Sequence, residues 1–157
     1  MAKRHHSLVP LSQDHHHGLA LALRLRQGDK ALLQDGWTHD RAEQARRVQQ
    51  FYERELRSHF QAEEEAVFPV LKQHSRRAGP LVDALLEQHR AIEQLVRVIA
   101  QVKGDELERS LVALGEVLEQ HIRLEERELF ELYQSDLSPQ LMESVGEGVR
   151  RAVASRT

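Results

Sequence analysis

The chain has 157 residues, of which 40% are hydrophobic and 30% are charged, and its formal net charge at pH 7 is −3. This length suits about one domain with a core of its own. The small negative charge, with arginine and glutamate interspersed, gives no reason to expect nucleic-acid binding. The absence of cysteine excludes disulfides, thiol nucleophiles, zinc fingers and iron–sulfur clusters, and it fits a reducing compartment.

The sequence contains no pattern typical of a secretory signal or a membrane span. The basic N-terminus, which includes Lys3 and Arg4, is not followed by an apolar segment. No apolar run approaches the roughly 20 residues that a spanning helix needs. We therefore expect a cytoplasmic protein whose partners include neither membranes nor nucleic acids. Its unusual feature is the presence of ten histidines, which are spread along the chain.

The first residues predict a short irregular segment followed by a helix. Residues 1–10 are polar overall and end at a proline, so we expect them to form an irregular lead-in. Apolar residues then recur at helical spacing over residues 11–27. Ser12 or Asp14 is the expected N-cap of this helix, and Gly28 is expected to end it.

Two further helices are predicted in the middle of the chain. A loop with two glycines over residues 28–39 leads to a long helix over about residues 40–73. Pro69 is expected to kink or end this helix, because proline lacks the amide hydrogen and clashes with the preceding turn. A third helix over about residues 80–102 starts with a proline, which the first turn of a helix tolerates well.

The last two helices complete the predicted fold. Residues 105–134 carry a long apolar stripe, and a shorter amphipathic helix follows over residues 139–154. No segment shows the alternation of a β-strand. We therefore predict an all-α protein in which residues 11–134 form an up-down-up-down four-helix bundle. Residues 138–157 would form a C-terminal helical appendage that covers a bundle end or contacts a second subunit.

A repeated motif relates the second helix to the fourth. The segment HFQAEEEAVFPVL at residues 59–71 matches HIRLEERELFELY at residues 121–133 in a histidine, two glutamates and a phenylalanine. In each segment a glutamate follows the histidine by four residues, so both side chains project from one helix face. Two such pairs facing each other supply ligands for two first-row transition metals. The second glutamates, Glu64 and Glu126, are expected to be solvated or paired between helices.

Each of the four long helices also carries one histidine on its apolar side. For a single histidine, a hydrogen bond to a neighbouring helix would be a sufficient explanation. The repeat, however, also places two glutamates on the inner side, and glutamate is almost never fully buried without compensation. Binding of metal would satisfy all six groups together. These groups are His15, His59, Glu63, His89, His121 and Glu125.

These motifs resemble the hemerythrin-like proteins, also called the HHE cation-binding domain. The resemblance covers about residues 8–134 and consists of four elements in order along the four helices. The elements are a single histidine, a His-x-x-x-Glu motif, a second single histidine and a second His-x-x-x-Glu motif. One His-x-x-x-Glu motif alone would be a weak signal, whereas this combination is specific. Here the elements are Asp14-His15, His59 to Glu64, His89 and His121 to Glu126.

The resemblance implies a non-haem di-iron centre in the core of the bundle. Two iron ions, linked by an oxo or hydroxo group, would be bridged by Glu63 and Glu125. Coordination positions left open would bind O₂, nitric oxide or peroxide. The ligand types alone do not distinguish iron from manganese or zinc as a substitute. The remaining ligands would be His15 and His59 for one iron and His89 and His121 for the other.

Two positions leave the ligand set open at this stage. The oxygen-carrying hemerythrins that the chain resembles have a second histidine one turn along the third helix, where this chain has Glu93. Glu93 is therefore either an added ligand or an acceptor for an imidazole N–H, and its presence argues against simple oxygen transport. His16 is an alternative to His15 as the ligand from the first helix. Asp14 is a candidate for orienting a neighbouring histidine.

Three classes of function follow from the sequence. The favoured one is a module that binds or senses O₂, nitric oxide, peroxide or iron at a di-iron centre. The second is a di-iron enzyme that acts on peroxide or O₂ as a catalase or an oxidase does, although no separate acid–base pair is evident. The third is a metal-free helical interaction protein. Residues 139–154 are the expected contact for a homodimer or another protein.

Overall fold

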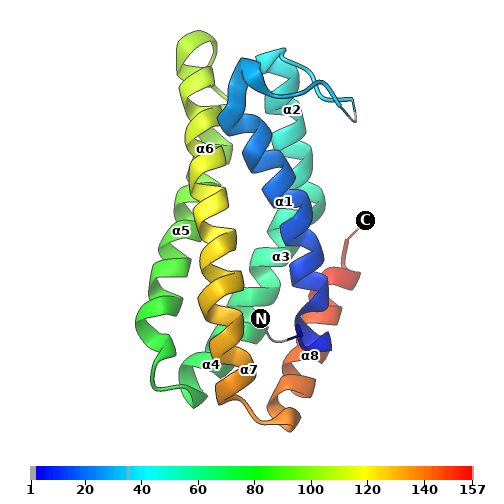
Figure 1. Ribbon diagram of the computed structural model, residues 1–157, viewed down its shortest axis with the longest axis vertical. Coiled ribbons are helices and arrows are strands. Elements are labelled where there is room, and N and C mark those ends of the chain that lie inside the picture. The colour runs from blue at the N-terminus through cyan, green and yellow to red at the C-terminus, as the bar shows by residue number, and fades with distance from the viewer. Residues whose placement is uncertain (1–2, 35, 157) are drawn as a thin grey trace.

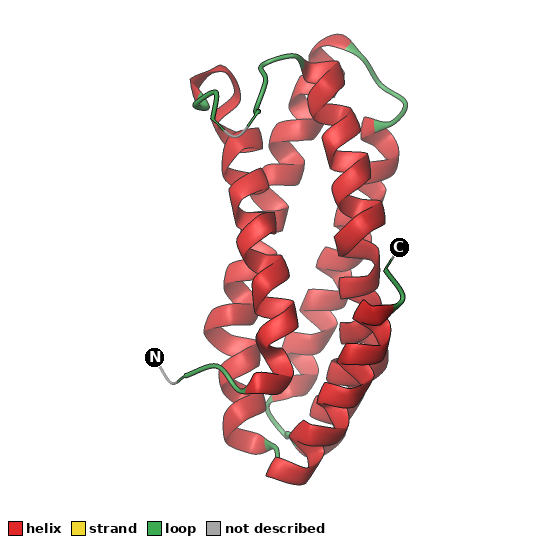
Figure 2. Cartoon of the chain, turned by 90° about the vertical axis from the view of Figure 1, so that its right-hand side faces the viewer, coloured by secondary structure: helices red, strands yellow, loops and turns green. Residues whose placement is uncertain are grey.

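The computed structural model describes residues 3–34 and 36–156, and its secondary structure over these residues is helical, without a strand. Four long helical segments run antiparallel as a bundle, and a fifth helix lies against one side (Figures 1 and 2). This arrangement confirms the predicted all-α four-helix bundle with an additional C-terminal helix. The first two residues of the predicted lead-in lie outside the described part of the chain.

The long segments differ in how many elements they contain. The first consists of the 3-10 turn η1 (His6–Leu8) and α1 (Val9–Gln27), followed by the short turn η2 (Gly28–Lys30). The second is a continuous run of α2 (Arg41–Phe51), η3 (Tyr52–Leu56), α3 (Arg57–Ala62), η4 (Glu63–Val67) and α4 (Phe68–His74). The third is α5 (Ala78–Ile99), and the fourth joins α6 (Gly104–Leu124), η5 (Glu125–Leu129) and α7 (Phe130–Asp136). The fifth helix is α8 (Pro139–Ala154).

The first helix begins earlier than the sequence pattern predicted. The turn η1 leads directly into α1, and Pro10 lies in the first turn of that helix, where the missing amide hydrogen is tolerated. The expected irregular lead-in is therefore wrong for residues 6–10. Ser12 and Asp14 lie inside the helix rather than at its N-cap. Gly28, with a φ of 56°, follows the last residue of α1 as predicted.

The second long segment continues through Pro69 instead of ending there. Its start is capped by Asp40, whose side chain accepts a hydrogen bond from the amide of Ala42. Directly before the proline, η4 is a π turn in which the amide of Phe68 donates to the carbonyl of Glu63. The same kind of turn, η5, occurs in the fourth segment without a following proline, so the turn does not require Pro69, and α4 extends beyond the proline.

The core of the bundle is divided into two apolar clusters. One lies at the end where α4, α7 and α8 meet and includes Phe68, Phe130 and Tyr133. The other lies toward the opposite end and includes Trp37 and Ile122. The predicted metal ligands lie between these clusters on each long segment. Over residues 3–34 and 36–156, none of the helices combines the length and the apolar character that a membrane crossing requires.

The C-terminal helix α8 packs against the bundle of its own chain (Figure 2). The buried face of α8 contacts η1, α3 and η4. A partner protein at residues 139–154 would therefore meet the outer face of this helix. The residues of the buried face are Met142, Val145, Gly146 and Val149.

The close approach of α1 and α6 depends on Gly115. A Cβ atom at this position would lie 2.7 Å from the carbonyl oxygen of Ala22 and 2.9 Å from Cγ of Arg26. We expect Gly115→Ala to lower the free energy of unfolding by about 1–3 kcal/mol, the usual effect of overpacking. Gly79→Ala is the matched control, because a Cβ there meets nothing within 4 Å apart from its chain neighbours. It should change stability less than Gly115→Ala, since the helix favours alanine over glycine whereas the following Pro80 disfavours a Cβ at this position. Urea unfolding measures both, and equal stability of the two variants would contradict the close packing.

Candidate metal centre

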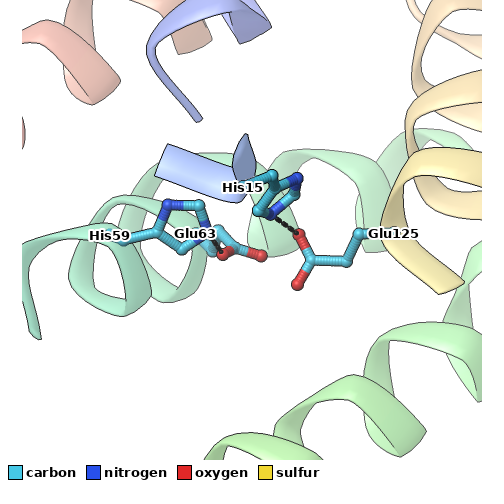
Figure 3. A group of neighbouring side chains, drawn as sticks. All are labelled: His15, His59, Glu63 and Glu125. Atoms are coloured by element: carbon cyan, nitrogen blue, oxygen red, sulfur yellow. Dashed lines mark ion pairs between the residues drawn. The ribbon is translucent and has the colours of Figure 1, made fainter. Parts of the chain in front are cut away.

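Six buried residues converge between the two apolar clusters, and each of them is at most 3% exposed. They form two overlapping groups whose potential ligand atoms lie within 4.8 Å of one another. Figure 3 shows the first group, in which side chains from three segments point toward a common space. The structure thus brings together all six residues that the sequence singled out. The groups are His15, His59, Glu63 and Glu125, and Glu63, His89, His121 and Glu125.

The carboxylate of Glu63 lies between two imidazoles from different helices. Its Oε1 atom contacts Nε2 of His59, one turn earlier on the same segment (Figure 3). Its Oε2 atom lies 3.9 Å from Nε2 of His89 on α5. The two oxygen atoms of Glu63 therefore face two different histidine pairs.

The carboxylate of Glu125 has the complementary arrangement. Its Oε2 atom lies 3.5 Å from Nε2 of His15 on α1, and its Oε1 atom lies 2.5 Å from Nε2 of His121. Both glutamates thus present one oxygen atom to the pair His15 and His59 and the other to the second pair. This is the arrangement that a carboxylate needs in order to bridge two cations.

The donor atoms of the centre fit a pair of cations. The Nε2 atoms of His15, His89 and His121, and both oxygen atoms of Glu63 and Glu125, are buried without a hydrogen-bond partner among the described residues. An unsatisfied buried polar group destabilises a protein by about 1–3 kcal/mol, so such a concentration of them indicates a ligand that binds them together. A set of donors made of imidazole nitrogens and carboxylate oxygens suits iron, manganese or zinc.

The outer nitrogen of each imidazole faces a second polar residue, through a hydrogen bond in three cases and at a longer separation in the fourth. The hydrogen-bonded atoms are carboxylate or amide oxygens, which only accept, so Nδ1 of His15, His59 and His121 carries the proton and donates it. The Nε2 lone pair is thereby directed into the centre. The distances from Nδ1 to oxygen are 2.9 Å for His15 and Glu126, 3.0 Å for His59 and Asp14, 2.8 Å for His121 and Gln88, and 3.4 Å for His89 and Glu64.

The two buried carboxylates differ in their affinity for protons. Burial and the neighbouring charge of Glu125 raise the pKa of Glu63 well above 4.5. Burial also acts to raise the pKa of Glu125, but the imidazoles of His121, His15 and His89 outweigh it and lower that pKa. Burial lowers the pKa of His121 to about 4, so its ring is neutral at pH 7, as ligation requires.

A comparison with protein families matches residues 7–133 to the hemerythrin HHE cation-binding domain. The chain belongs to this family. Comparisons with curated proteins and with solved structures each gave no match. The matched range of the HHE domain contains all six converging residues and ends before α8.

The first glutamate in each copy of the repeat begins a π turn, which the sequence pattern does not predict. The turn η4 starts at Glu63 and the turn η5 starts at Glu125. A π turn bonds each amide to the carbonyl five residues earlier, and such turns are frequent at functional sites. The only hint in the sequence is that Glu63 and Glu125 occupy the same position in the repeat, because hydrophobic spacing does not distinguish a single π turn from an α turn.

Phenylalanine rings pack on the imidazoles of the HHE centre. The two phenylalanines of the repeat stack on histidines of other helices, Phe68 on His89 and Phe130 on His15, each with 5.5 Å between ring centroids. Phe60 lies closer to His89, at 3.7 Å. These rings restrict rotation of the imidazoles and keep water away from one side of the centre.

Two residues that the sequence suggested as further ligands lie elsewhere. His16 is exposed on α1 and belongs to neither group, because a step of one residue turns a side chain by about 100° around the helix. His15 is therefore the histidine that α1 directs inward. Glu93 pairs with Arg90 at 2.7 Å and is also outside both groups. The centre thus has four histidines and two glutamates.

The second glutamates of the repeat pair between helices, as predicted. Glu126 accepts hydrogen bonds from Arg4 at 3.0 Å and from Ser12 at 2.7 Å, and Glu64 forms an ion pair with Arg90. Their position beside imidazoles of the centre was not foreseen. The sequence contains one sign of this position, because each copy of the repeat has two adjacent glutamates. A residue next to a ligand can reach the imidazole of another helix.

Asp14 connects the centre to the C-terminal end of the chain, in the orienting role proposed for it. Its Oδ2 atom accepts from Nδ1 of His59, and its two oxygen atoms accept from the guanidinium group of Arg156 at 3.0 and 2.7 Å. Arg156 also donates to Oγ of Ser58 and to the carbonyl of Glu55. Burial acts to raise the pKa of Asp14, but the hydrogen bonds with His59 and Arg156 outweigh it and lower that pKa. A residue beyond the matched HHE range thus fixes an orienting carboxylate.

Substitution of Arg156 tests this connection. Arg156→Gln removes the charge and the paired hydrogen bonds that hold Asp14, so we expect the affinity of the centre for Fe²⁺ to fall by about 10–100-fold. Arg156→Lys should reduce it less, because lysine keeps the charge but not the two-pronged contact. Arg150→Gln, at an exposed position of α8, is the matched control and should have no effect. Competition with a chelator measures the affinities, and wild-type affinity in Arg156→Gln would show that the contact does not act on the centre.

Proposed function

We propose that this HHE domain is a di-iron binding protein that binds or senses O₂, nitric oxide, peroxide or iron itself. The observation that carries the proposal is the orientation of Glu63 and Glu125, each with one oxygen atom toward each histidine pair. Two iron ions would be held between these carboxylates, and manganese or zinc would also suit the donors. One ion would be held by His15 and His59, and the other by His89 and His121.

The protein residues prepare the centre for small ligands. When bound, the iron pair would supply redox chemistry and coordination positions that the protein leaves open. The orienting acceptors direct the imidazoles inward before metal arrives, and four packed helices hold them there. A hollow of about 210 Å³ is lined in part by Phe60 and Glu64, both of which lie beside His89. We propose this hollow as the approach for a diatomic molecule or peroxide.

The buried polar residues favour binding over catalysis. Among the buried polar side chains of the described chain, those at the centre are the six donors and Asp14. We assign a ligand or orienting role to all seven, which leaves no further fully buried group there, among the described residues, to move protons, as an enzyme acting on peroxide or O₂ would need. For a sensor, we propose that a partner contacts α8, since Arg156 directly beyond this helix is bonded to Asp14.

Metal content tests the bridging role of Glu63. We expect about two iron ions per wild-type chain, in line with two groups of ligands that share both carboxylates. Glu63→Gln should lose both ions, because a neutral amide cannot bridge two cations as a carboxylate does. Glu65→Gln, an exposed neighbour on the same segment, should keep both. Elemental analysis measures the iron, and full iron content in Glu63→Gln would contradict the proposal.

Stability of the metal-free protein separates lost ligation from misfolding. The folded state raises the pKa of Glu63 above 4.5, so it binds this proton more tightly than the unfolded state, and stability is lost as pH rises above 4.5. Glu63→Gln has no carboxyl group to ionise, so this loss of stability with rising pH is absent from the variant. The metal-free variant should therefore be at least as stable as metal-free wild type at pH 7, with a shallower decline from pH 4.5 to 7. Denaturant unfolding at several pH values measures this.

Spectroscopy and turnover separate binding from catalysis. The oxidised, iron-loaded protein should absorb in the near-ultraviolet, and azide should change this spectrum if a coordination position is open to small anions. Peroxide should be decomposed no faster by wild type than by Glu63→Gln, as measured from O₂ release. Rapid release that requires Glu63 would instead favour the catalase-like alternative.

A further inference from the structure

A second group of metal donors lies on the surface, where the N-terminal segment (residues 3–8) meets α8. Nε2 of His6 lies 2.6 Å from Oε1 of Glu143, and Nε2 of His5 lies 4.0 Å from the same atom. The three donor atoms lie within 4.8 Å of one another, and the two imidazole rings have centroids 4.2 Å apart. Two imidazole nitrogens and one carboxylate oxygen thus face a common point, and none of them belongs to the buried centre.

Close packing of the N-terminal segment on α8 brings these donors together. Gly146 lies one turn after Glu143 on α8, and a Cβ atom there would lie 3.0 Å from Cβ of Ser7. The absence of a side chain at Gly146 therefore lets the backbone next to His5 and His6 lie against the helix. Backbone packing therefore contributes to bringing the three side chains together, in addition to the contact between His6 and Glu143.

A chain of hydrogen bonds orients the ring of His5. Its Nδ1 atom lies 2.7 Å from Oγ of Ser7, which lies 2.8 Å from the hydroxyl of Tyr133. The tyrosine donates in turn to the carbonyl of Met142, and burial raises the pKa of Tyr133 to about 12, so this proton is retained. The amide of Ser7 donates to the same Nδ1 at 3.1 Å, so without a cation Nε2 carries the proton toward Glu143. A cation at Nε2 would shift this proton to Nδ1, from which the ring would donate to Oγ of Ser7.

We propose that His5, His6 and Glu143 form an exchangeable site for a divalent first-row transition metal such as Zn²⁺. Two imidazoles and a carboxylate suit such ions, whereas Mg²⁺ and Ca²⁺ prefer oxygen ligands throughout. In a tetrahedral site with bonds of about 2.0–2.2 Å the donor atoms lie about 3.3–3.6 Å from one another, so His6 and Glu143 must separate slightly and His5 must approach Glu143. The side chains of His6 and Glu143 are 63% and 54% exposed, so they have the space to do so. This exposure also distinguishes the site from the buried centre, because its ion can exchange with solution.

An ion at this site would fasten the N-terminal segment to α8. Arg4, the neighbour of His5, donates to Oε2 of Glu126 at 3.0 Å and to the backbone carbonyl of Glu126 at 3.2 Å. The Oε1 atom of Glu126 accepts from Nδ1 of His15. One short segment therefore carries two donors of the surface site and the arginine that holds an orienting carboxylate of the centre. Cation binding at the surface should restrain this segment.

Separate counting of zinc and iron tests the site. Iron-loaded wild-type protein, dialysed against buffered Zn²⁺, should gain one zinc ion per chain and lose no iron. His6→Gln and Glu143→Gln should bind this zinc at least tenfold more weakly with unchanged iron, and Ser7→Ala about tenfold more weakly through loss of the acceptor for Nδ1. His74→Gln, an exposed histidine at the end of α4, is the matched control and should behave as wild type.

Equal zinc binding by wild type and His6→Gln would overturn the site. Zinc that only replaces iron, one ion for one ion, in both proteins would also overturn it. Hydrogen exchange gives a second readout, because Zn²⁺ should slow exchange of the amides of residues 4–8 in wild type and not in Glu143→Gln. Unchanged exchange in wild type would overturn the restraint of the segment. If the buried centre bound zinc instead of iron, wild type would still hold one zinc ion more than His6→Gln, so the two proposals fail separately.

Discussion

Two carboxylates enclosed among four imidazoles are the constraint on which the rest of the structure depends. Glu63 and Glu125 are fully buried between two apolar clusters, where an uncompensated charge destabilises a protein by an amount on the order of several kcal/mol. The residues and turns around the two buried carboxylates all serve to position them and the imidazoles beside them. Phenylalanine rings fix the imidazoles, outer acceptors set the tautomers of three of them, and two of the three π turns in the described chain begin at these glutamates. Cations at the centre would compensate both charges at once.

The outer acceptors attach one histidine pair to the ends of the chain. Glu126, which faces His15, is held by Arg4, and Asp14, which faces His59, is held by Arg156. Both arginines lie outside residues 7–133, the range that matches the HHE domain. The family motif therefore accounts for the donors, whereas the segments around it account for the orientation of two of them. The proposed surface site lies in one of these segments, next to Arg4.

Sequence patterns predicted the fold and the placement of the donors well, because both follow from local periodicity. Four apolar stripes with one inward histidine each, and His-x-x-x-Glu repeated at 59 and 121, were enough to place six side chains on inner faces. The start of α1 and the π turns were missed, since the choice between hydrogen-bonding patterns over a few residues leaves no periodic signal. The contact between Asp14 and Arg156 joins residues 142 positions apart, and no spacing rule reaches that far.

The acceptors behind the imidazoles also make the two halves of the centre chemically unequal. His15 and His59 each donate to a carboxylate, whereas His121 donates to the neutral amide of Gln88, and the carboxylate facing His89 is 3.4 Å away. A carboxylate behind an imidazole pushes electron density onto the ligating nitrogen. The pair on α1 and α3 is therefore the stronger base toward a cation. The two ions would therefore bind one after the other, and a protein with a single ion would carry it at His15 and His59.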